Sequence, residues 1–136
     1  MNLHDWTVIR TAATGGLLVI IPGAFVSSVL LNNDATGLSW LFLCIVFVGF
    51  GVAGFVGGRL RPDTPMLHGA LGGLLAFVVT QVFGLMTVLS RGGSVVWIAI
   101  PLTALLAISL GVGGALLSDI MHRRTVRTPN TADAGR

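Results

Sequence analysis

The sequence has very little charge and few chemically reactive side chains. Charged residues make up 10% of its 136 residues, whereas a soluble domain carries about 25%. Lysine and glutamate are absent, so every basic residue is an arginine and every acidic residue an aspartate. We attribute this bias to a GC-rich bacterial genome. The single cysteine, Cys44, cannot form an internal disulfide and is expected to pack as a small apolar residue.

Motifs for catalysis and ligand binding are also missing. No H-E-x-x-H, C-x-x-C, Walker-type or plausible Ser–His–Asp arrangement occurs, and the histidines (His4, His68 and His122) lack metal-ligand spacing. Residues 49–54 (GFGVAG) fit G-x-G-x-x-G, but they lie inside an apolar run, which argues against a dinucleotide site. No basic run is interleaved with aromatic residues, so nucleic acid is not an expected partner. We therefore expect no enzyme activity, no cofactor and no bound metal.

Four long apolar stretches without a central charge dominate the rest of the chain. They are residues 11–31, 38–58, 67–89 and 95–117. Each has about 20 residues or more, enough for a helix to cross a hydrocarbon layer of about 30 Å. The first stretch is longer than a signal-peptide core and lacks a cleavage site, so we expect it to be retained. The sequence predicts an all-α membrane protein with four transmembrane helices.

Short connections favour one compact arrangement of these helices. The loops 32–37, 59–65 and 90–94 are rich in turn-forming residues and force consecutive helices to be antiparallel neighbours. We expect residues 1–119 to form a four-transmembrane-helix bundle. Residues 120–136 are polar and are expected to form a disordered cytoplasmic tail.

The arginines are distributed unevenly between the two ends of the predicted bundle. Seven of the eight lie before the first stretch, in loop 59–65 or after the last stretch, and only Arg91 lies on the other side. Because arginine-rich loops stay in the cytoplasm, we expect a multi-pass protein of the bacterial plasma membrane with cytoplasmic termini. Arginines at this interface usually contact lipid headgroups, and the predicted headgroup contacts are Arg59, Arg61, Arg123 and Arg124.

The two halves of the chain resemble each other at an offset of 57 residues. Ala-x-Gly-Gly-Leu-Leu occurs at 13–18 and again at 70–75, and Trp40 aligns with Trp97. Gly54 likewise aligns with Gly111. Each copy would hold two helices, so the copies would be parallel repeats related by an axis along the membrane normal. The alternative is that helical hairpins independently need glycine at crossings and tryptophan at interfaces.

Small residues recur at four-residue spacing and predict where helices touch. In lipid, close backbone approach and interhelical hydrogen bonds hold helices together. Gln81 is the only amide within a stretch, and Pro22 and Pro101 are expected to bend their helices. The large aliphatic and aromatic residues are expected to face lipid. The predicted packing or partner contacts are Gly49, Ala53, Gly54, Gly57, Gly72, Ala76, Thr80, Gln81, Gly84, Ala107, Gly111 and Ala115.

Residues 51–81 (GVAGFVGGRLRPDTPMLHGALGGLLAFVVTQ) contain a glycine-rich helix ending in Gly-Gly-Arg, a loop with prolines, and a helix opening with His-Gly-Ala. In these features the segment resembles the YrzE-like family of short four-span bacterial membrane proteins. The resemblance implies the four-span topology and no particular activity.

Taken together, these patterns predict a non-enzymatic integral membrane protein that acts through contacts. We expect an accessory or assembly subunit of a plasma-membrane complex or a small homo-oligomer, with membrane lipids and other membrane subunits as partners. The alternative is a small transporter or conduit for a neutral or lipid-like substrate, bent at the two prolines and lined by Gln81, Thr80, Ser27 and Ser28.

Overall fold

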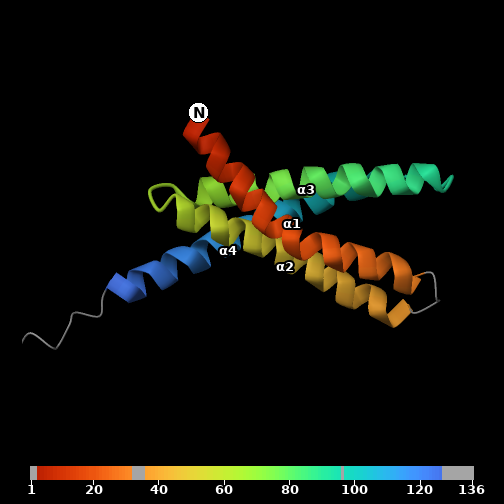
Figure 1. The fold of residues 1–136 in the computed structure, drawn as a ribbon, viewed down its shortest axis with the longest axis horizontal. Coiled ribbons are helices and arrows are strands. Elements are labelled where there is room, and N and C mark those ends of the chain that lie inside the picture. Colours follow the sequence, from red (N-terminus) through yellow and green to blue (C-terminus); the bar gives the residue numbers. More distant parts are fainter. Residues whose placement is uncertain (1–2, 32–35, 96, 127–136) are drawn as a thin grey trace, which may run out of the picture.

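The computed structural model describes residues 3–31, 36–95 and 97–126 and confirms the predicted all-α fold (Figure 1). Four helices and no strand occur in this part of the chain: α1 (Leu3–Leu31), α2 (Thr36–Leu60), α3 (Pro65–Ser90) and α4 (Ala99–Val126). Three of them contain segments long and apolar enough to cross a membrane, within Asp5–Gly23, Pro65–Ser90 and Ala99–Arg124. In α2 the apolar segment Cys44–Leu60 is shorter.

Local sequence explains where the third helix begins and ends. Pro65 opens α3, at a position where a helix has no use for the missing amide hydrogen. After Ser90 the amide of Arg91 bonds back to the Val88 carbonyl, and Gly92 takes a φ of 68° that favours glycine. The loop between α3 and α4 therefore begins with a tight turn at Arg91 and Gly92.

The last helix is displaced toward the C-terminus relative to the predicted stretch. It begins at Ala99 rather than at residue 95, so Pro101 lies in its first turn, where no helical hydrogen bond is lost. The expectation that Pro101 bends the helix is therefore corrected, whereas Pro22 lies inside α1 as expected.

Both ends of the chain are more helical than expected. The first helix begins at Leu3, before the first apolar stretch, and α4 runs to Val126, into the segment expected to be a disordered tail. Asp119 and Arg123 are paired one turn apart at 2.9 Å, and basic residues in the last turn suit the negative end of the helix dipole. Residues 127–136 of the predicted tail lie outside the described residues.

The helices form two hairpins that cross each other (Figure 1). The second helix occupies the centre, because it contacts α1, α3 and α4; α3 contacts α1 and α4 as well, whereas the described parts of α1 and α4 do not touch. The hairpins α1–α2 and α3–α4 spread apart toward their tips (Figure 1). From Val82 to Ser90 every residue of α3 except Leu85 is exposed, so the described part of the chain covers little of this part of the helix.

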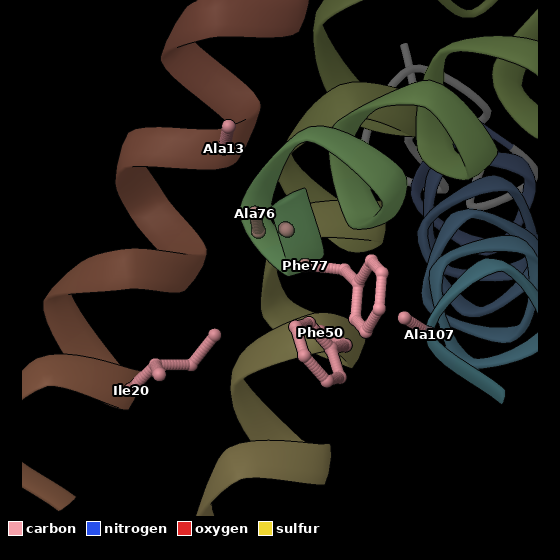
Figure 2. Close-up of a cluster of buried hydrophobic side chains, with 7 residues drawn as sticks. Ala13, Ile20, Phe50, Ala76, Phe77 and Ala107 are labelled. Carbon is pink, nitrogen blue, oxygen red and sulfur yellow. The ribbon is translucent and has the colours of Figure 1, made fainter. Parts of the chain in front are cut away.

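The core is built mainly from small side chains (Figure 2). The Phe50 and Phe77 rings pack against each other in this core, with their centroids 6.4 Å apart. The rings are tilted relative to each other, as aromatic pairs prefer. Four of the seven core residues are alanines, which let the helix backbones approach closely as association in lipid requires. The core members are Ala13, Ile20, Phe50, Ala53, Ala76, Phe77 and Ala107.

Candidate functional site

The closest helix contact lies between α2 and α4. A Cβ atom added to Gly54 would overlap the carbonyl group of Gly111, and one added to Gly58 would lie 2.9 Å from the Cα of Ala115. These pairs are the residues that the 57-residue offset aligns, so each position meets its own counterpart across the contact. Such pairing is what a two-fold axis between α2 and α4 produces. The symmetry is incomplete, because α2 touches α3 while the described parts of α1 and α4 do not meet.

The third helix closes one side of this contact. A Cβ on Gly69 would lie 2.8 Å from the Gly111 oxygen, and one on Gly73 would lie 2.8 Å from the Ala107 oxygen. At the end of α2, a Cβ on Gly57 would lie 2.8 Å from the His68 oxygen. Since backbone atoms are the obstacles, no side-chain movement can relieve these overlaps.

Most of the predicted packing residues lie inside the bundle. At five of the predicted glycines an added Cβ would lie less than 3.0 Å from an atom of another helix, so that neighbouring atom would have to move. The predicted alanines are 0% exposed. The tightly packed glycines are Gly49, Gly54, Gly57, Gly72 and Gly111, and the buried alanines are Ala53, Ala76, Ala107 and Ala115.

Three predicted residues on α3 behave differently. The Thr80 hydroxyl donates to the Ala76 oxygen of its own helix at 2.8 Å, and both Thr80 and Gln81 are only half-buried. An added Cβ on Gly84 would meet no atom within 4 Å. The small-residue face of α3 thus continues beyond the last helix that packs on it.

A polar cluster joins three segments at the opposite end of α3. Arg61 of the loop between α2 and α3 forms an ion pair with Asp5 of α1, and the His68 Nε2 lies 3.8 Å from the same Asp5 oxygen. The His68 Nδ1 lies 3.0 Å from the Thr64 hydroxyl oxygen and 3.1 Å from the Thr64 carbonyl oxygen, so the ring contacts Thr64 through Nδ1 and approaches Asp5 through Nε2.

The cluster is largely removed from solvent. The side chains of Asp5 and His68 are 20% and 6% exposed, and the Arg61 Nε is buried without a hydrogen-bond partner among the described residues. Arg61 therefore links α1 to the loop between α2 and α3, and its predicted contact with headgroups stays a prediction. No sequence signal paired it with Asp5, because the two lie 56 residues apart.

A small polar pocket of about 140 Å³ lies where α2 ends against α4. Ser118 is 4% exposed in this pocket, and the side chain of Arg59 is exposed at its rim. Asp119 in the same pocket is paired with Arg123. The pocket lining is Gly58, Arg59, Pro62, Ser118, Asp119, Met121 and His122.

An open apolar groove of about 500 Å³ runs between α2 and α4. Gly51 and Gly113 leave space in it, since a Cβ on either would meet no atom within 4 Å. The Ser109 hydroxyl donates to the Leu105 oxygen at 2.9 Å, so the groove presents no unpaired hydroxyl. Its other lining residues are Phe47, Val48, Val52, Phe55, Leu110, Gly114 and Leu117.

The remaining predicted residues are partly described. Arg123 and Arg124 are exposed in the last turns of α4, and their contact with headgroups stays a prediction. Trp97 is exposed just before that helix begins. The side chains of Ser27, Ser28 and Trp40 lie outside the described part of the chain.

No protein-family model, curated protein or solved structure matches the chain. The resemblance to the YrzE-like family therefore stays a prediction.

Proposed function

We propose that this protein is a non-enzymatic membrane subunit that binds the transmembrane helix of another subunit or of a second copy. It would serve as an accessory or assembly subunit of a bacterial plasma-membrane complex, or as a small homo-oligomer. The observation that carries the proposal is the face of α3 on which Thr80 and Gln81 are half-buried and an added Cβ at Gly84 would meet no atom within 4 Å.

This face continues the row by which α3 packs inside the molecule. Gly73, Ala76 and Thr80 follow one another at helical spacing, and Gly84 comes one turn later. The inner members meet α4 or the core, whereas nothing in the described chain approaches Gly84. In lipid a glycine offers no side-chain contact to acyl chains, but it lets a second helix come close enough for backbone packing. Gln81 beside it supplies an amide for an interhelical hydrogen bond.

The outer turns of α3 are exposed where such a helix would lie. Both hairpin tips point to the same end of the molecule and stand apart from each other (Figure 1). The outer turns of α3 expose large apolar side chains, among them Phe83 at 66% and Met86 at 65%. A partner helix lying along this surface would bury them together with the small-residue row.

The proposed orientation follows from the arginines. Arg10, Arg59 and Arg123 lie near the end where α1 begins and where α2 and α4 finish, and we place this end at the cytoplasm. Single cysteines added near each terminus of a Cys44→Ser chain should then be labelled from the cytoplasmic side only. Labelling of the two termini from opposite sides would contradict the orientation.

Partner capture with a matched pair of glycine variants tests the function. The tagged chain is purified from its own membranes in mild detergent as wild type, as Gly84→Leu and as Gly113→Leu. Both glycines have open space around an added Cβ, so both variants should fold. We expect Gly84→Leu to lose the copurifying subunit or second copy at least tenfold, because close packing of about 2 kcal/mol is removed. Gly113→Leu should retain it.

Two results would count against the proposal. One is recovery of the wild-type chain as a lone monomer in every mild detergent. The other is equal retention of a partner by both variants, because contact at Gly84 would then be irrelevant.

A further inference from the structure

The polar pocket and the apolar groove follow one another along α2 and α4, and together we call them the α2–α4 seam. On α2 the groove residues Gly51 and Phe55 are followed at helical spacing by Arg59 of the pocket, so all three lie on one helix face. On α4 the groove residues Gly114 and Leu117 are likewise followed by Met121 of the pocket. The third helix packs against the other side of the α2–α4 contact, which leaves this seam open.

The lengths match one leaflet of a bilayer. At about 1.5 Å per residue, the groove between Phe55 and Phe47 lies roughly 6 to 18 Å along α2 from Arg59. Half of a hydrocarbon core is about 15 Å. The groove therefore spans the depth that an acyl chain occupies when its headgroup lies at the level of Arg59.

The pocket offers several hydrogen-bond donors. Ser118 is 4% exposed and brings a hydroxyl to the lining, Arg59 is exposed and brings a guanidinium, and His122 adds a ring nitrogen. Arg123 already neutralises Asp119, the acidic residue of the lining. The pocket thus has an excess of positive charge and a bidentate donor, which suit a phosphate group.

We propose that this seam binds one phospholipid of the cytoplasmic leaflet, with its phosphate in the pocket at Arg59 and Ser118 and an acyl chain along the groove over Gly51 and Gly113. The two glycines act as specificity residues, because any larger side chain there would occupy the space of the acyl chain. Ordinary annular lipids need no such groove, so the bound molecule would survive delipidation that removes them.

Native mass spectrometry of the full chain, delipidated in dodecyl maltoside, tests the site. Wild type should retain one phospholipid per chain. Arg59→Gln and Ser118→Ala remove phosphate donors, and Gly113→Leu fills the groove, so each should reduce retention, by about tenfold or more for Arg59→Gln. Arg124→Gln removes the same charge outside the pocket and should retain the lipid.

A second measurement separates the phosphate from the acyl chain. The melting temperature of the delipidated chain is recorded with dioleoyl phosphatidylglycerol, with dioleoylglycerol and with inorganic phosphate. The phospholipid should stabilise wild type, while the chain-only and phosphate-only probes should not. Gly113→Leu should lose this response and still melt as cooperatively as wild type, which shows that it has folded.

Three outcomes would overturn the proposal. Equal loss of lipid in Arg59→Gln and Arg124→Gln would indicate non-specific charge attraction. Full retention by Gly113→Leu would place the acyl chain elsewhere. Stabilisation by inorganic phosphate as large as that by the phospholipid would make the pocket a site for a free anion.

Discussion

Replacing Gly111 by alanine should separate α3 from α4. An added Cβ at this position would lie 2.5 Å from the Gly69 carbonyl oxygen and 3.4 Å from the Gly73 Cα. Ordinary carbon contacts are about 3.5 Å, so the helices would have to move apart by about 1 Å. Because the obstacle is backbone, rotation of a side chain cannot absorb the change.

The size of the effect follows from this displacement. Overpacking of a tight contact costs about 1–3 kcal/mol. Alanine also favours the helix over glycine by about 1 kcal/mol, which partly offsets the loss. Gly113 on the same helix separates the cost of overpacking from the gain in helix propensity. An alanine there gains the same helix propensity, and its Cβ meets no atom within 4 Å. We expect Gly111→Ala to be less stable than Gly113→Ala by about 1–3 kcal/mol.

Unfolding of both variants by sodium dodecyl sulfate in mixed micelles, followed by circular dichroism, measures this difference. Comparing the two variants with each other, rather than each with wild type, cancels the propensity term. Equal stability of Gly111→Ala and Gly113→Ala would refute the reasoning, because it would mean that α3 and α4 do not approach each other as closely as the structure shows.

Three further variants can be measured by the same unfolding titration. Leu105→Ala should change the unfolding free energy by less than about 0.5 kcal/mol, because Leu105 is 63% exposed; a loss as large as that of a buried leucine would mean that another helix covers it. Asp5→Asn should destabilise by about 1–3 kcal/mol by leaving the Arg61 charge unpaired, and adding Arg61→Gln should recover part of the loss, whereas additive losses would show that the pair does not interact. Pro101→Ala should change stability by less than about 0.5 kcal/mol, because a first-turn proline breaks no helical hydrogen bond, and a large change would restore the predicted bend.

The helices and much of their packing could be predicted because the relevant signals are local. A run of about 20 apolar residues identifies a membrane helix without reference to the rest of the chain. A glycine or alanine every fourth residue marks a helix face, and Gly54, Gly111 and Ala115 lie in close contacts as expected. Helix ends were less predictable. Arg123 and the other residues after 117 are polar, and only their pairing along α4 shows that the helix continues.

The polar features were harder to predict because they depend on residues far apart in the chain. Asp5 and Arg61 are 56 residues apart and meet only because α1 crosses the loop at the start of α3. Ser118 has no local signal that distinguishes it from any other serine in an apolar helix. Its burial beside Arg59 follows from where α2 ends against α4.

Hydrophobicity and small-residue spacing along the chain determined that this protein has four apolar helices and which faces of them permit close contact. Both properties belong to single helices, so a one-dimensional pattern is sufficient to specify them. The tertiary structure decided which of these faces pack against another helix. Gly111 packs against α2 and α3, whereas an added Cβ at Gly84 or Gly113 would meet no atom within 4 Å. A small-residue face has the same sequence whether or not a helix lies against it, and only the crossing of the two hairpins determines which of these faces remain free for a partner helix or a lipid.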